Sequence, residues 1–208
     1  MTPPRRERPA GLVLAGGRSR RFGRDKASAE LRGRPLLHWV LERLAPFCGE
    51  LLVATSPAGK PPPLPATPVP IRVVRDDAPF EGPLGGMIAA FRTVRAERCL
   101  VAACDAPFLS PRLLERMIQA EGDVVLARVG GVLQPLPGVY AVAPARAVIE
   151  EAFARGERRI LGAIASLRLT VLDEEEVRAL DPDFGTFVNL NTPAALAEAA
   201  RHLSATTS

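Results

Sequence analysis

The chain has 208 residues, of which 47% are hydrophobic and 24% are charged, and its formal net charge is +4 at pH 7. This length suits one large domain or two small ones, and the composition is that of an ordinary globular protein. No run of like charges resembles a nucleic-acid-binding arm, and one Trp, one Tyr and eight Phe are too few for a base-stacking platform. We therefore expect no nucleic-acid partner.

The N-terminal segment and the cysteines indicate the cellular compartment of the protein. Residues 1–9 are basic and proline-rich, with no apolar segment of signal-peptide length behind them, and no apolar run reaches the roughly 18 residues of a membrane span. Three cysteines cannot all pair, and Cys99 and Cys104 flank an apolar run, as buried thiols do. We expect a disordered tail over 1–9, a single domain over 10–208, reduced thiols, no membrane partner and a cytoplasmic location.

Short, nearly continuous apolar runs alternate along the chain with segments of helical period. Such runs are typical of strands covered on both faces, and the alternation predicts an α/β, doubly wound, mostly parallel sheet with helices on both faces. The expected strands are 11–15, 50–55, 71–75, 98–104, 123–129, 134–140 and 167–173. The expected helices are 35–47, 83–96, 110–121, 144–155 and 192–202, the third and last of which open on Ser-Pro and Thr-Pro caps.

Conspicuous residues follow the expected strands, where ligands of doubly wound sheets bind. Gly16 and Gly17 follow the first strand and leave room for backbone N–H groups to approach an anion, and the arginines and Lys26 beyond them add positive charge. The sequence fits neither GxGxxG nor GxxxxGK[ST]. This loop is a candidate phosphate site, or else a strand-ending turn with a solvated basic face.

Asp105 directly follows the buried run VAAC. Mg²⁺ takes one or two protein carboxylates and completes its shell with phosphate oxygens and water, so Asp105 is a candidate metal ligand, with a turn or capping aspartate as the alternative. EGPLGG is a second glycine-rich turn at a helix start. Alternatively, Gly85 and Gly86 only allow the helix to pack closely.

Six stretches, in this order and spacing, resemble the molybdenum cofactor guanylyltransferases, which belong to the nucleotidyltransferases marked by LAGG followed by R-x-G-x-DK. They are LAGGRSRRFGRDK, GPLGG, CDAPFL, QPLPGVY, GERRI and FVNLNTP. The resemblance extends from about Gly11 to Leu203, and GPLGG, GERR and FVNLNTP narrow it to the guanylyl branch.

The resemblance implies a Rossmann-like fold, GTP and Mg²⁺ as requirements, and GMP transfer to the phosphate of molybdopterin with release of pyrophosphate. The expected GTP contacts are Leu14, Ala15, Gly16, Gly17, Lys26, Asp76, Pro83 and Asp105. Lys26, Arg21 and Asp105 are the expected catalytic residues, with Asp105 also holding the metal. No general base is needed, because the attacking phosphate is already anionic. Molybdoenzymes or cofactor-handling proteins are candidate transient partners.

Two motifs are assigned to the second substrate through the resemblance. GERRI puts Arg158 and Arg159 at the start of an expected helix, and arginine suits a bidentate contact with the molybdopterin phosphate. Asn189 and Asn191, at the end of an expected short strand, would bind the pterin edge. The alternative is a solvated arginine pair and a turn asparagine.

One departure concerns the base. An asparagine often found in the family after the second strand is replaced here by Ala54, Thr55 or Ser56. Asp76 is a candidate guanine reader, with Asp77 as the adjacent alternative, because a carboxylate can accept from both guanine donors. Backbone groups around Leu14 and Pro83 could do the same.

Two rival functions remain open on the sequence. One is a related nucleotidyltransferase that uses CTP or a sugar-phosphate acceptor. The other is a non-catalytic GTP-binding chaperone of the cofactor, against which the presence of both Lys26 and Asp105 argues.

Overall fold

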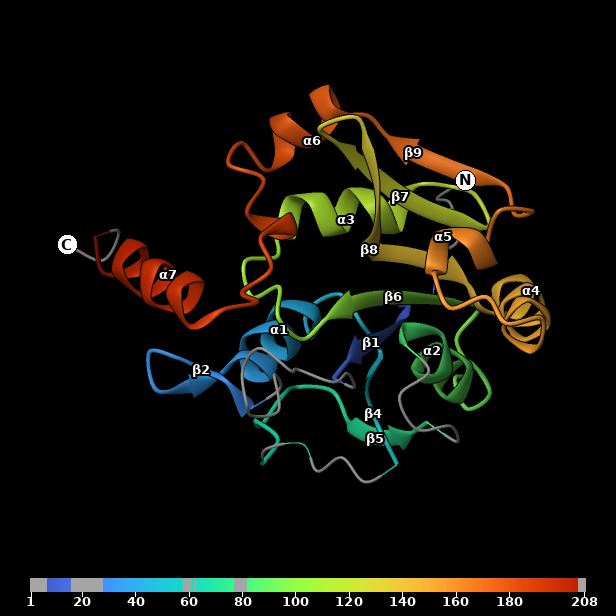
Figure 1. The fold of residues 1–208 in the computed structure, drawn as a ribbon, viewed down its shortest axis with the longest axis horizontal. Helices are drawn as coiled ribbons and strands as arrows, with labels where there is room; N and C mark the ends of the chain where they lie inside the picture. The colour runs from blue at the N-terminus through green and yellow to red at the C-terminus, as the bar shows by residue number, and fades with distance from the viewer. Residues whose placement is uncertain (1–6, 16–27, 58–60, 62, 77–81, 206–208) are drawn as a thin grey trace, which may run out of the picture.

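The computed structural model describes residues 7–15, 28–57, 61, 63–76 and 82–205. The strands are β1 (Ala10–Leu14), β2 (Glu30–Leu31), β3 (Arg34–Pro35), β4 (Glu50–Thr55), β5 (Ile71–Arg75), β6 (Arg98–Ala103), β7 (Val124–Val129), β8 (Val132–Ala141) and β9 (Leu169–Leu172). Strands β2 and β3 form a hairpin, and the others form one sheet in the order β5-β4-β1-β6-β8-β7-β9 (Figure 1).

The main sheet is mostly parallel. Strand β1 pairs in parallel with β4 and β6, β4 pairs in parallel with β5, and β7 pairs in parallel with β9. Strand β8 runs antiparallel to both of its neighbours. All five residues of β1 are buried, as expected for an apolar strand covered on both faces. The predicted α/β, doubly wound fold is confirmed, with β8 as its antiparallel member.

Helices cover both faces of this sheet. They are α1 (Leu36–Leu44), α2 (Pro83–Phe91), α3 (Pro111–Gln119), α4 (Val142–Ala154), α5 (Ile160–Ala163), α6 (Glu174–Leu180), the 3-10 helix η2 (Gly185–Phe187) and α7 (Pro193–Ala205). One core cluster joins the sheet to α1, α3 and α6, and a second joins it to α2, α4 and α5. Helix α7 projects from the body and packs against β2 (Figure 1).

Both predicted caps are present. The Ser110 hydroxyl oxygen accepts from the Leu113 N–H at 3.4 Å, and that of Thr192 accepts from the Ala195 N–H at 3.1 Å. The helix expected over 83–96 ends earlier, at Phe91. One expectation is wrong: residues 188–191 form no strand and follow η2 instead.

The thiols agree with a further expectation. Cys48, Cys99 and Cys104 are buried and form no disulfide with one another. Within the described part of the chain, no helix is both long and apolar enough to cross a membrane. The tail predicted over 1–9 lies mostly outside the described residues, so its boundary and the extent of the single domain stay predictions.

Candidate active site

The turn into α2 places a carboxylate against a helix N-terminus. Gly82, at φ +82°, precedes Pro83, the first residue of α2. A Cβ on Gly85 would lie 2.1 Å from the Asp76 Oδ2 atom, so this carboxylate occupies the space that the glycine leaves. The Asp76 N–H donates to the Thr55 carbonyl oxygen at 2.9 Å, which fixes the residue at the end of β5. Asp76 therefore lies against the first turn of α2, the helix that begins at Pro83.

The next glycine, Gly86, brings α2 against β1 and β4. A Cβ on Gly86 would lie 3.2 Å from Leu14 Cδ2 and 3.1 Å from the Ala54 Cβ. The Ala15 N–H donates to the Ala54 carbonyl oxygen at 2.9 Å, which extends the strand pairing by one step. Close helix packing, the plainer reading of this motif, is therefore confirmed. Ala54 is used in that packing, and its methyl group offers a nucleotide no polar contact.

Asp105 lies just beyond the end of β6 and is 7% exposed. The Cys104 N–H donates to the Leu14 carbonyl oxygen at 3.2 Å, and the Asp105 carbonyl oxygen accepts from the Leu190 N–H at 2.8 Å. These bonds tie the residue to the end of β1 on one side and to 188–191 on the other. Asp105 thus stands between the end of β1 and the segment that carries the two asparagines.

The donor chemistry at Asp105 fits a magnesium ion. Among the residues that the structure describes, no three His, Cys, Asp or Glu side chains form a metal-binding group. A nucleotide-bound Mg²⁺ needs few protein ligands, because phosphate oxygens and water fill most of its shell. A single, largely buried carboxylate at a strand end meets that requirement.

Hydrogen bonds among Ser110, Leu180, Asp181 and Thr186 form a clasp just before the asparagine segment, residues 188–191. The sequence alone did not indicate this clasp. The Asp181 carboxylate is 8% exposed and accepts from the Thr186 N–H at 2.9 Å. The Thr186 hydroxyl oxygen accepts from the Ser110 N–H at 2.8 Å, and the Ser110 hydroxyl donates to the Leu180 carbonyl oxygen at 2.9 Å. The clasp fixes η2 against the start of α3. Asn189 in the following segment is exposed, whereas Asn191 is half-buried.

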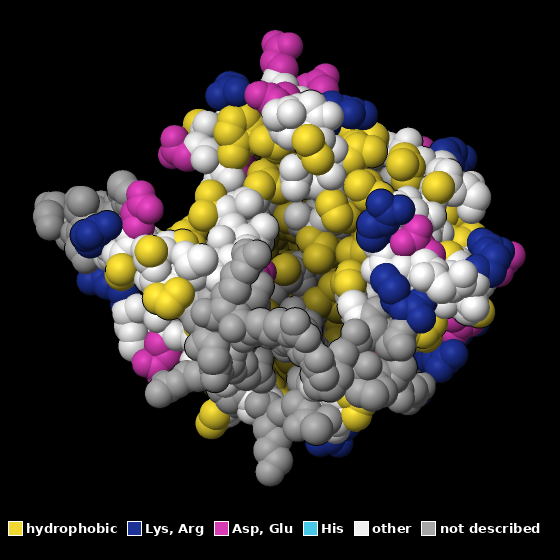
Figure 2. Space-filling view, in the orientation of Figure 1, with side chains coloured by type: hydrophobic (Ala, Val, Ile, Leu, Met, Phe, Trp, Pro, Cys, Tyr) yellow, Lys and Arg dark blue, Asp and Glu magenta, His cyan; other side chains and the backbone are white. Residues whose placement is uncertain are grey.

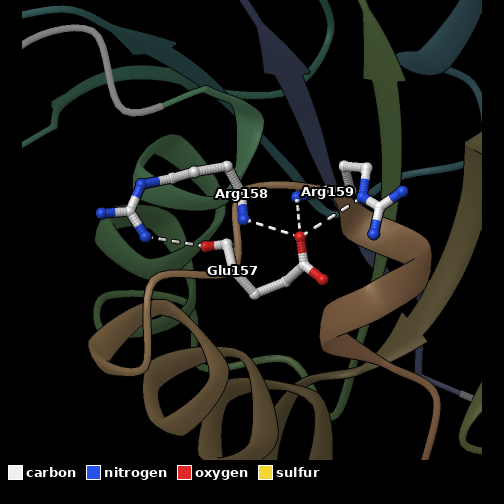
Figure 3. Close-up of polar contacts among 3 residues, drawn as sticks. All are labelled: Glu157, Arg158 and Arg159. Carbon is white, nitrogen blue, oxygen red and sulfur yellow. Dashed lines mark hydrogen bonds and ion pairs between the residues drawn. The ribbon is translucent and has the colours of Figure 1, made fainter.

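Glu157 organises the loop between α4 and α5. Its Oε1 atom accepts from the Arg159 N–H at 2.9 Å and from the Arg158 N–H at 2.8 Å (Figure 3). These backbone hydrogen bonds hold the pKa of Glu157 below its ordinary value. A Cβ on Gly162 would lie 2.0 Å from Glu157 Oε2, so the other carboxylate oxygen rests on α5.

The two arginines of this loop have different surroundings. The Arg158 guanidinium donates to the carbonyl oxygens of Phe153 and Glu157, at 3.0 and 2.8 Å, and lies 4.3 Å from the centre of the Phe153 ring. The Arg159 side chain points the other way, as Figure 3 shows. It is 86% exposed, and its Nε atom donates to the Glu157 Oε1 atom at 3.5 Å. A Cβ on Gly82 would lie 3.4 Å from the Arg158 carbonyl oxygen, so this loop adjoins the turn into α2.

Figure 2 shows a hollow in the surface with hydrophobic side chains on its floor. Arginine side chains, with an acidic side chain between them, lie along its right-hand rim. Of the predicted site, Gly16, Gly17, Arg21 and Lys26 lie outside the described residues.

Known proteins share this chain's sequence and fold. Residues 11–169 match the model of the MobA-like NTP transferase domain. A probable molybdenum cofactor guanylyltransferase of Chloroflexus aggregans is 38% identical over 195 residues, which cover 88% of this chain and 89% of the relative. A molybdenum cofactor guanylyltransferase of Cereibacter sphaeroides is 38% identical over 194 residues, covering 91% of this chain and 94% of the relative.

Among solved structures, the molybdopterin-guanine dinucleotide biosynthesis protein A of Archaeoglobus fulgidus superposes with a TM-score of 0.76 at 27% identity, covering 94% of this chain and 99% of that one. Two curated relatives and this structural neighbour therefore agree with the family model. The chain is a nucleotidyltransferase that belongs to the MobA-like NTP transferase family, among the molybdenum cofactor guanylyltransferases.

Proposed function

We propose that the protein transfers GMP from GTP to the phosphate of molybdopterin, giving molybdopterin guanine dinucleotide and pyrophosphate. An acceptor phosphate oxygen forms a bond to the α-phosphorus of GTP, and the bond from that phosphorus to the pyrophosphate oxygen breaks. The observation that carries the proposal is the meeting of Asp105, the first turn of α2 and the loop before α5 at one edge of the sheet. The names of the relatives supply the substrates.

The reaction needs placement and charge neutralisation more than proton transfer, because the attacking phosphate is already an anion. We assign Asp105 to hold Mg²⁺, which when bound neutralises charge on the phosphate oxygens. Lys26 and Arg21 are proposed to neutralise the triphosphate, and the N–H groups of Gly16 and Gly17 to face it. Molybdoenzymes or cofactor-handling proteins are proposed as transient recipients of the product.

The guanine is proposed to bind at the start of α2. Guanine presents N1–H and N2–H₂ donors side by side, and the Asp76 carboxylate is a matching acceptor. Leu14, Ala15 and Pro83 supply backbone groups around it. The support for this assignment is the contact of Asp76 and Leu14 with neighbouring glycines of one helical turn.

The acceptor is proposed to bind opposite the nucleotide. Arg159 is the better candidate for the molybdopterin phosphate, since its guanidinium is exposed while that of Arg158 is engaged with α4. Arg158 then supports the loop. Asn189 and Asn191 are proposed to contact the pterin edge, and the hydrogen bond from the Leu190 N–H to Asp105 supports their placement near the metal.

Pyrophosphate release from a panel of nucleoside triphosphates, with Mg²⁺ and molybdopterin present, tests the function. GTP should give release that depends on both molybdopterin and metal, and CTP, ATP and UTP should give far less. Asp105→Asn should lower the rate by roughly 10²–10³, the scale for losing a charge that acts on the transition state. Its fold should survive, because the isosteric amide keeps the backbone bond to Leu190.

Each rival function predicts a different result. A preference for CTP would indicate a cytidylyl enzyme, and GTP binding without pyrophosphate release would indicate the non-catalytic chaperone. Asp183→Asn is the matched control, because Asp183 is exposed on the loop before η2. Equal rates for the Asp105 and Asp183 variants would remove Asp105 from the metal site.

A further inference from the structure

Strand β8 contains a large bulge opposite β7. Val125 of β7 pairs with Val139, and Ala127 pairs with Gln134, so Leu126 alone faces the four residues 135–138. Bulges of this kind bend a strand and often lie beside active sites, where they redirect side chains. The motif QPLPGVY, to which the proposed function assigns no role, forms this bulge.

The bulge lies at the edge of the sheet that carries the candidate site. Its last residue, Gly138, pairs with Val101 of β6, so the bulge runs beside the end of β6 that leads to Asp105. The turn η2, which precedes the asparagine segment, lies against β8. Leu136 packs against the core cluster that contains Ile160, the first residue of α5. The bulge therefore lies in a strand that contacts η2, and its Leu136 packs against the core layer that includes α5.

The exposed part of the bulge suits the face of a flat ring. Pro135 and Leu136 are half-buried, and Pro137 is buried. Neither proline carries an N–H, so this stretch has an apolar surface with few donors. Gln134 adds an amide at its edge, where the side-chain nitrogen donates to the Val132 carbonyl oxygen at 3.5 Å. A heteroaromatic ring needs this combination of an apolar face and polar groups at the rim.

One buried side chain holds the bulge in shape. The Tyr140 hydroxyl donates to the Pro135 carbonyl oxygen at 2.6 Å, and the tyrosine is 0% exposed. A Cβ on Gly138 would lie 2.8 Å from that same oxygen and 2.9 Å from the Tyr140 ring, so only glycine allows the strand to fold back so closely. Burial raises the pKa of Tyr140 well above its ordinary value, and the hydroxyl remains a donor.

We propose that residues 134–137 form the wall against which the pterin ring of the acceptor packs, and that Tyr140 is the positioning residue that holds this wall. The inference rests on the proposed function and deepens it, since it names the surface that selects a flat heterocycle. Tyr140 touches the wall and not the substrate.

Tyr140→Phe tests the proposal, because it removes one hydroxyl from a buried ring and leaves the ring in place. Fluorescence anisotropy of 6-hydroxymethylpterin phosphate reports binding of the ring without turnover. We expect the Kd of this probe to rise by about fivefold to tenfold, the scale for one lost hydrogen bond. The KM for molybdopterin should rise by a similar factor while kcat and the Kd of GTP stay near the parent values. Leu136→Ala, which trims the wall itself, should act in the same direction.

Thr170→Val is the matched control. The Thr170 hydroxyl also donates to a backbone carbonyl oxygen, that of Glu121, before β7. This variant should lose stability and bind the probe as the parent does. An unchanged probe Kd in both the Tyr140 and Leu136 variants, or an equal loss in Thr170→Val, would overturn the proposal.

The parent protein separates this inference from the proposed function. If it binds the probe in a Tyr140-dependent way but releases no pyrophosphate from GTP and molybdopterin, the result supports the proposed wall and refutes the proposed guanylyl transfer. If it releases pyrophosphate and the Tyr140 and Leu136 variants keep the parent KM for molybdopterin, the result supports the proposed function and refutes the proposed wall. A parent that does not bind the probe refutes the wall.

Discussion

Arg158 and Arg159 are adjacent in the chain, yet their guanidinium groups meet different surroundings. Arg158 donates to two carbonyl oxygens and lies over Phe153, so it stabilises the end of α4. Arg159 extends into solvent, although its backbone N–H is held by Glu157. The Arg159 Nε atom donates to the Glu157 Oε1 atom at 3.5 Å, and the rest of the guanidinium is exposed. An exposed side chain on a fixed backbone can bind an anion at low entropic cost.

This contrast predicts that Arg159→Ala acts on the acceptor alone. The KM for molybdopterin should rise by about tenfold or more, because a charge-assisted, bidentate contact with phosphate is lost. The KM for GTP and the melting temperature should stay near the parent values. Arg155→Ala is the control, since Arg155 is also exposed and pairs only with Glu151 on the same helix among the described residues. If both variants kept the parent KM for molybdopterin, the phosphate contact would have to be assigned elsewhere.

Sequence alone could not separate these two arginines. The motif GERRI predicts an electropositive helix start, and Arg159 is indeed the N-cap of α5. Which guanidinium is engaged depends on Phe153 and on the path of the loop, and both are set by tertiary packing. The locations of Asp76 and Asp105, by contrast, follow from the strands that precede them, so sequence predicted them well.

At the scale of elements, the first turn of α2 joins three strand ends. Gly85 lies against Asp76 at the end of β5, and Gly86 lies against the ends of β1 and β4. Glycine is costly inside a helix, by roughly 0.5–1 kcal/mol relative to alanine. The cost is offset by the close approach that the glycines allow, which brings the first turn of α2 against these strand ends.

Gly85→Ala should therefore destabilise the protein by about 1–3 kcal/mol despite its better helix propensity, because the new methyl group would overlap the Asp76 carboxylate. Urea unfolding measures the change, and the Kd of GTP should rise as the carboxylate is displaced. In an Asp76→Ala background the same substitution should cost much less, as the double-mutant cycle would show. An equal cost in both backgrounds would contradict the contact.

Elements differed in how far their sequence determined them. Strands β4 and β5 have the predicted bounds, since each is an apolar run ended by polar or proline residues. Helix α6 and the turn η2 were missed, because they are short and depend on remote partners. The bond from the Ser110 N–H to the Thr186 hydroxyl oxygen, for example, joins residues 76 positions apart. The bulge in β8 was missed for the same reason, since its pairing with β7 and β6 defines it.

For the molecule as a whole, the central sheet separates two apolar cores and places the site at one edge. Cys48 belongs to one core and Cys99 to the other, and both thiols are 0% exposed. Burial raises the pKa of Cys48 to about 12 and the pKa of Cys99 well above its ordinary value. These thiols report on the integrity of both layers, because each ionises at a higher pH in the folded protein than in the unfolded chain.

Stability should therefore fall at alkaline pH. An unfolded thiol loses its proton near pH ~8.5, whereas the folded thiols keep theirs to a much higher pH. The unfolded state then binds fewer protons than the folded state, so the free energy of unfolding decreases as pH rises above this value. Between about pH 8 and about pH 10 the loss should be roughly 2 kcal/mol for each thiol. Urea unfolding at the two pH values measures it, and the double variant Cys48→Ala, Cys99→Ala should show a shallower dependence. Ellman's reagent should leave both thiols of the native protein unmodified at the lower pH and react with them in urea; rapid reaction without urea would show that the two cores open independently of global unfolding.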